Sequence, residues 1–204
     1  MNVETPQASP ALTDQNAFGV LLSYLDVEQD EYASDDSKAF VARFSAFRAA
    51  IAEFLDAFPL ASPVRAWGLG HSVYLEFEEG DEEAELIPWL KNCRARLTGA
   101  EFRSAAILSY GSRWVSSESE DAHLVVLEPG ENPAVRWSVL PGPSECWRHA
   151  LAADTAVRED EEAESGWGPG LYLDVDAVEA LGKSPNNQPT ILRVAGAGFF
   201  RAGS

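Results

Sequence analysis

The clearest pattern in the chain is a stripe of apolar residues between Asp36 and Pro59. Its members recur at steps of three and four residues, which places them on one face of an amphipathic helix. Ser34, Asp35 and Asp36 offer N-caps, and Pro59 ends the helix. We expect this stripe to pack in the core; its members are Phe40, Val41, Phe44, Phe47, Ile51, Phe54, Leu55 and Phe58.

Strand patterns lie on both sides of this helix. The apolar run at residues 18–27 predicts a buried strand. Residues 64–67 and 72–77 predict a hairpin around the glycine turn 68–70, because apolar and other positions alternate along its second arm. The turn places His71 and Ser72 at the bend, where a ligand can reach them.

The remaining patterns complete the predicted order of elements. A second helix passes through Leu86, Ile87, Leu90 and Leu97, with Pro88 in its first turn. Residues 102–115 predict a strand broken by Gly111, and 123–128 and 134–140 predict two more strands. Ser144 begins a helix that runs to about Val157. The last elements are a strand at 171–175, a short helix at 175–181 and a strand at 190–194, after which residues 196–201 close the chain.

This order predicts an α+β fold with a mixed, largely antiparallel sheet and helices packed on one face. We expect a flexible N-terminal tail over residues 1–17 and a single domain over residues 18–204. A chain of 204 residues, 46% of them hydrophobic, is long enough for one sizeable core.

Charge restricts the partners of the domain. The chain carries 33 acids and 15 bases, a formal net charge of −18. Such a field repels nucleic acid and anionic membranes and favours a basic partner, so we expect neither nucleic-acid nor membrane binding. The first fifteen residues have no secretory pattern, and Cys93 and Cys146 suit buried thiols, so we expect a cytoplasmic location.

Five segments, taken in order, carry a resemblance to a known family. They are residues 21–27 (LLSYLDV), 70–77 (GHSVYLEF), 102–111 (FRSAAILSYG), 141–151 (PGPSECWRHAL) and 171–181 (LYLDVDAVEAL). Together they resemble the catalytic domain of class III nucleotidyl cyclases, which implies a ferredoxin-like, nucleotidyl-cyclase-like fold. The family holds two divalent ions between two aspartates, and the resemblance places Asp26 at the first and His71 at the second.

Three departures from the family concern the chemistry itself. His71 stands where the second acid is needed, and imidazole suits softer ions than Mg²⁺. The family's asparagine falls on Cys146 and its arginine on Ala150, while Arg148 is two residues away and faces another side of the helix. The resemblance therefore implies a non-catalytic domain that binds a protein partner or a second copy, with no cofactor expected.

Two alternatives stay open. A divergent active cyclase would hold Mg²⁺ or Mn²⁺ with Asp26 and a rearranged acid such as Glu28, Asp30 or Glu76. An acidic interaction protein, such as an immunity protein, would neutralise a basic partner through its charge.

The candidate site residues form two groups. Asp26, His71 and Ser72 are the candidates for a metal or ligand cleft, although Asp26 alone could simply cap a loop at a strand end. The candidate interface consists of Trp114, Trp137, Trp147 and Arg148, since tryptophan is enriched in binding hot spots. Tryptophans in such positions also pack against cores. Cys146 and His149 are spaced to share a ligand on one helix, although a packed helix face also explains that pair.

Overall fold

A computed structural model describes residues 12–26, 37–57, 65–69, 71–78, 85–116, 145–159, 168–183, 192–194 and 196–202. The elements, in chain order, are β1 (Leu12–Tyr24), α1 (Ser37–Ala57), β2 (Arg65–Leu69), β3 (Ser72–Glu78), α2 (Leu86–Gly99), β4 (Ser104–Ser116), α3 (Glu145–Glu159), β5 (Gly170–Asp174), α4 (Val175–Ala180), β6 (Leu192–Val194) and β7 (Ala197–Arg201).

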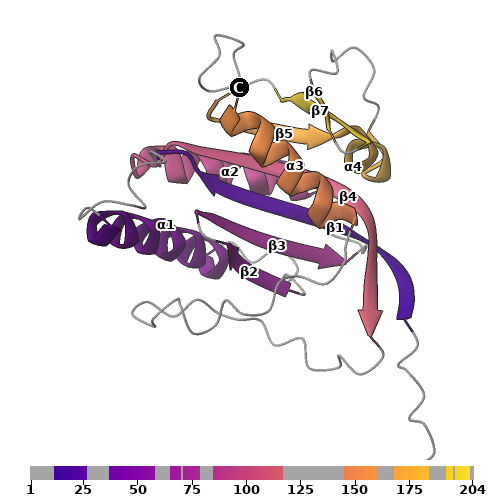
Figure 1. The fold of residues 1–204 in the computed structure, drawn as a ribbon, viewed down its shortest axis with the longest axis horizontal. Coiled ribbons are helices and arrows are strands. Elements are labelled where there is room, and N and C mark those ends of the chain that lie inside the picture. Colours follow the sequence, from indigo (N-terminus) through magenta and orange to yellow (C-terminus); the bar gives the residue numbers. More distant parts are fainter. Residues whose placement is uncertain are drawn as a thin grey trace, which may run out of the picture.

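The described strands form one seven-stranded sheet in the order β2-β3-β1-β4-β5-β7-β6 (Figure 1). The first six elements, β1 to β4 with α1 and α2, have the β-α-β-β-α-β arrangement of ferredoxin-like folds. All strand pairs are antiparallel except β4 with β5. The predicted α+β fold with a mixed, largely antiparallel sheet is confirmed.

Alternation along the strands divides the core into two layers. The larger layer joins Phe18, Val20 and Leu22 of β1 to α1, α2 and α4. The smaller layer joins Leu21 and Leu25 to residues of α3. The sequence places the helices on one face; α1, α2 and α4 share that face, and α3 packs against the other (Figure 1). Tyr74 and Tyr172 extend the face under α3, which explains why that face also needs a helical cover.

The stripe predicted between Asp36 and Pro59 forms α1 and supplies much of the larger layer. Its aromatic rings pack against β1, with the ring centroids of Tyr24 and Phe47 5.5 Å apart. Phe44, Phe47, Ile51 and Phe54 are buried, as expected. Val41 differs from the predicted core position, because it is 49% exposed at the margin of the buried face.

Two strands are longer than the sequence predicts. β1 begins at Leu12, so residues 12–17, which the sequence assigns to a tail, belong to the strand. β4 runs to Ser116 and is not broken at Gly111, which pairs with Ala17. Thirteen consecutive pairs join the two strands. Backbone hydrogen bonding extends these strands regardless of their polar side chains. The periodicity of apolar residues alone does not detect this pairing.

Several predicted features lie outside the described residues. These are the strands at 123–128 and 134–140, Gly70 of the hairpin turn, Trp137, and the acids Glu28 and Asp30. Among the helices that are described, none combines the length and apolar character that a bilayer crossing requires.

Candidate functional site

Asp26 and His71 lie at the same end of the sheet. β1 and β3 are adjacent, with Ser23 opposite Ser72. The backbone N–H of Tyr24 donates to the carbonyl of His71 at 3.0 Å, which closes the ladder beside the turn. The positions of Asp26 and His71 follow directly from this pairing, since Asp26 comes just after β1 and His71 just before β3.

Asp26 forms an ion pair with the residue that precedes β4. Arg103 Nη1 donates to Asp26 Oδ1 at 3.0 Å, and the backbone N–H of Leu25 donates to the Arg103 carbonyl at 2.9 Å. The Asp26 side chain is 30% exposed and that of Arg103 is 52% exposed, so the pair is well solvated. This geometry joins a strand end to the neighbouring loop, the simpler of the two roles considered for Asp26.

His71 contacts α3 instead. Its Nε2 lies 3.3 Å from Oδ2 of Asp154, whose side chain is 3% exposed. Burial on its own raises the Asp154 pKa, but the hydrogen bond from His71 and the charge of Arg158 hold that pKa below its usual value near 3.8. The carboxylate is therefore an acceptor, and His71 Nε2 carries the hydrogen.

Arg158 extends this contact into a network of polar side chains and backbone. Its Nε donates to Asp154 at 3.3 Å, and its Nη2 donates to the Tyr24 carbonyl at 2.6 Å and to the Ser23 hydroxyl. The buried Ser72 hydroxyl in turn donates to Ser23 at 3.3 Å. Ser72 therefore belongs to a packed polar cluster rather than to an open cleft.

The two candidate ligands thus have separate partners. Asp26 pairs with Arg103, and His71 pairs with Asp154. Within the described residues, no three His, Cys, Asp or Glu side chains are grouped so that they could hold one metal ion. Glu76, considered as a replacement acid, is buried beneath α3, where Tyr74 donates to it at 3.3 Å.

The remaining positions of the family motif are also enclosed. Cys146 and Ala150 both have 0% exposure and face the sheet from α3. The Cys146 sulfur lies 3.2 Å from the Tyr74 hydroxyl, so its spacing from His149 reflects a packed helix face. Polar groups of a substrate have no access to these two side chains.

The candidate interface residues divide between core and surface. Trp147 is half-buried and packs edge-on against Tyr74, with centroids 4.9 Å apart. Arg148 is exposed on the outer side of α3 and lies 3.7 Å from Glu145. The backbone of Trp114 pairs with Asp14, but the Trp114 side chain, like Trp137, is outside what the structure describes.

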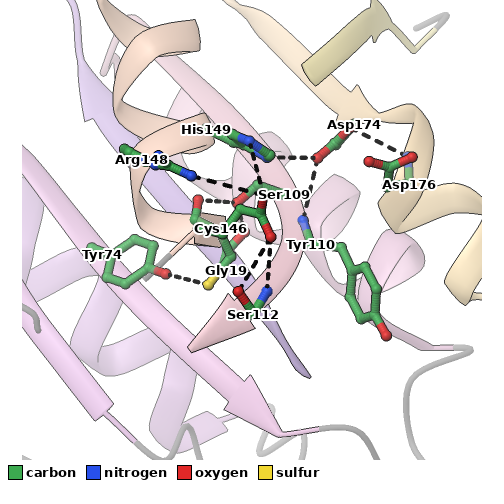
Figure 2. Close-up of polar contacts among 11 residues, drawn as sticks. Gly19, Tyr74, Ser109, Tyr110, Ser112, Cys146, Arg148, His149, Asp174 and Asp176 are labelled. Carbon is green, nitrogen blue, oxygen red and sulfur yellow. Dashed lines mark hydrogen bonds and ion pairs between the residues drawn. The ribbon is translucent and has the colours of Figure 1, made fainter. Parts of the chain in front are cut away.

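A second site, which the sequence did not predict, is an open cleft of about 400 Å³ at the opposite end of α3 from Asp154. It lies where β4, the start of α3 and α4 meet (Figure 2). Its lining combines three acids with neutral polar, aromatic and small residues and consists of Asn16, Tyr110, Gly111, Ser112, Glu145, His149, Asp176, Glu179 and Ala180.

A close approach between β4 and α3 shapes one wall of this cleft. A Cβ atom on Gly111 would lie 2.9 Å from Cγ of Glu145 and 3.2 Å from the backbone nitrogen of Cys146, so only glycine fits there without displacement. The approach lets Glu145 Oε2 accept hydrogen bonds from both the backbone N–H and the hydroxyl of Ser112, each at 3.3 Å.

Buried Asp174 supports the opposite wall. Its Oδ1 caps α4 by accepting from the Asp176 N–H at 3.3 Å, and its Oδ2 accepts from the Tyr110 N–H at 3.4 Å. Burial and the neighbouring charges of Asp174 and Glu179 raise the pKa of Asp176. The cleft therefore concentrates negative charge where β4 and α4 converge.

Part of this cleft could have been found from sequence. The segment LYLDVDAVEAL contains a strand followed by two acids at a helix start, and His149 stands three positions after Cys146 on the preceding helix. Tyr110, Ser112 and Glu145 gave no signal, because their proximity depends on the pairing of distant segments. No protein-family model matches the chain, and no curated protein sequence matches it.

Proposed function

We propose that this chain is a non-catalytic, cyclase-like domain that works by binding a protein partner or a second copy of itself. The observation that carries the proposal is the separate engagement of Asp26 by Arg103 and of His71 by Asp154. Phosphoryl transfer by two metal ions needs carboxylates that face the same ions, and a nucleophile activated between them.

The surroundings of His71 support the proposal further. An imidazole whose Nε2–H donates to a buried carboxylate is oriented by α3. Turning the ring toward Asp26 would leave Asp154 and Arg158 with a broken buried network, which is costly. The proposal places the domain in the cytoplasm, where the two free cysteines stay reduced.

A second candidate function, an acidic protein that neutralises a basic partner, is favoured by the acidic cleft at α3 and by the net charge of −18. Opposite charge accelerates association with such a partner. The two functions agree in requiring binding and differ in the partner, because a second copy of this chain carries the same negative charge.

A cyclase assay tests the leading proposal. The purified full chain is incubated with ATP or GTP and either Mg²⁺ or Mn²⁺, and cyclic nucleotide is measured by mass spectrometry beside an active class III cyclase. We expect no product above that of Asp26→Ala. Formation of cyclic nucleotide that Asp26→Ala abolishes would overturn the proposal and establish the divergent enzyme.

Light scattering during size-exclusion chromatography then separates the two kinds of partner. A mass that rises with protein concentration supports a second copy of the chain. A constant monomer mass, together with a defined basic protein captured at low salt and released as salt rises, supports the acidic interaction function. A monomer that binds neither partner contradicts both.

A further inference from the structure

The acidic cleft between β4, α3 and α4 has the chemistry of a site for an organic cation. Glu145, Asp176 and Glu179 line it, and Asp174 lies directly behind His149. The exposed Arg148 guanidinium is 3.7 Å from Glu145, and such a solvated pair contributes little to stability. Arg148 pairs with Glu145 and so supplies no counter-charge to the other carboxylates of the cleft. Acidic side chains alone are commonly just solvated surface, so the inference depends on what lies among them.

His149 provides that independent observation. Its side chain is 8% exposed, and its Nδ1 is fully buried yet has no hydrogen-bond partner within the described part of the chain. Asp174 Oδ2 lies 3.7 Å from Nδ1, and Glu145 Oε1 lies 4.0 Å from Nε2. Both separations exceed hydrogen-bond length, so the imidazole lies between two carboxylates at ion-pair distance without a hydrogen bond to either. Figure 2 marks the contact between His149 and Asp174 with a dashed line.

Nε2 of His149, on the other edge of the ring, has no hydrogen bond to any described residue, since Glu145 Oε1 is 4.0 Å away, and a ligand in the cleft can supply one. A cation with several N–H groups, placed between Glu145 and His149, would donate to the carboxylate and to Nε2 of the neutral imidazole. That choice leaves the hydrogen on Nδ1, directed at Asp174. One ligand group would thereby contact Glu145 and His149 together, while Nδ1 stays 3.7 Å from Asp174.

The other walls indicate an organic cation rather than a bare metal ion. The cleft volume of about 400 Å³ falls in the range of small-molecule sites, about 300–1,000 Å³. Tyr110 adds an aromatic side chain, which attracts ammonium and guanidinium groups, and Asn16 and Ser112 add neutral hydrogen-bonding groups. Metal ions would need a tighter grouping of ligands than the described residues provide.

We propose that this cleft binds an organic cation through a guanidinium or primary ammonium group, held between Glu145, Asp176 and His149. The cation comes either from a free small molecule or from a basic side chain of a bound protein. This inference names the chemistry recognised by the proposed binding function. The inference about the cation can fail while the proposed binding function stands, because neither Asp26 nor His71 lines the cleft.

Isothermal titration calorimetry of the full chain at about 150 mM salt, where distant charges are screened, tests the proposal. Agmatine represents a free cation, N-acetylarginine amide a protein side chain, and N-acetylcitrulline amide a neutral mimic of the same shape. We expect saturable binding of at least one cation and none of the citrulline compound. Stronger binding of agmatine identifies a small-molecule ligand, and stronger binding of the arginine amide identifies a side chain.

Variants locate the binding. Glu145→Gln and Asp176→Asn should each weaken it by about tenfold or more, since each removes a charge that contacts the cation. Glu53→Gln on the exposed side of α1 removes the same charge elsewhere and should leave the affinity unchanged. Equal weakening by all three variants, or equal binding of the citrulline compound, would overturn the proposal, as would absence of binding at millimolar concentration.

A titration followed by nuclear magnetic resonance needs only the wild-type chain, so it tests the proposal even if a variant folds poorly. Titration of the wild-type chain with the tighter cation should shift the backbone amide signals of Ser112 and Tyr110, whose N–H groups donate to Glu145 and Asp174. Saturable shifts confined to other elements would place the cation elsewhere and contradict the proposal.

Discussion

His71 Nε2 lies 3.3 Å from Asp154 Oδ2, a contact between residues 83 positions apart in the chain. It joins the turn between β2 and β3 to the last turns of α3, and Arg158 continues the contact to the end of β1. The residue that the cyclase resemblance places at a metal ligand therefore serves to hold a helix on the sheet.

Asp154→Asn should lower the free energy of unfolding by about 3 kcal/mol, because it leaves the Arg158 guanidinium without its charged partner inside a buried network. Asp26→Asn is the matched control, since it removes the solvated partner of Arg103 and should cost less than about 1 kcal/mol. Urea denaturation measures both. Similar losses for the two variants would contradict the structural role of the His71–Asp154 pair.

Acid should remove the contribution of Asp154. Because its folded-state pKa is depressed, the folded protein binds fewer protons than the unfolded chain near the usual pKa of 3.8. The stabilisation is fully present above that value and is lost as the pH falls through the lower, folded-state pKa. Urea midpoints measured from about pH 7 to about pH 3 should show the difference between wild type and Asp154→Asn shrinking in acid. A constant difference would show that the carboxylate charge has no part in it.

Gly111→Ala should destabilise the protein by about 1–3 kcal/mol, because the added Cβ would push the start of α3 away from β4. Gly99→Ala at the end of α2 is the control: a Cβ there meets nothing within 4 Å, and alanine favours a helix. Thermal unfolding compares the two. Equal stability of the alanine variants would contradict the close approach that shapes the cleft.

The cysteines should be inert in the folded protein. Burial raises the pKa of Cys93 to about 12, so almost none of it is thiolate at neutral pH, and Cys146 is enclosed between α3 and Tyr74. A colorimetric thiol reagent should label both only after denaturant is added. Rapid labelling of the native chain would place a thiol at the surface.

Much of the fold was predictable because it depends on local periodicity. The three-and-four spacing of α1 and the alternation of β3 determine which side chains are buried, and an antiparallel pair necessarily places the end of β1 beside the hairpin turn. That pairing is why Asp26 and His71, which the cyclase resemblance groups together, lie at one end of the sheet.

The partners of these residues were not predictable in the same way. Arg103 and Asp154 reach Asp26 and His71 through pairing across 77 and 83 positions, and no local pattern encodes that register. The acidic cleft was missed for the same reason, since Tyr110, Glu145 and Asp176 come from three separate elements. Continuous pairing of β4 through Gly111 likewise depends on its partner strand.

The central claim is that Asp26 and His71 have structural roles and do not hold a metal ion. Its most direct test is to measure Mn²⁺ binding by the full chain, with ATP or GTP present, by electron paramagnetic resonance. The structural roles of Asp26 and His71 predict the same amount of bound Mn²⁺ in the wild type and in Asp26→Asn. Weak binding to the acidic surface is common to both proteins, so it cancels in this comparison. A saturable Mn²⁺ site that needs nucleotide and disappears in Asp26→Asn would contradict the claim.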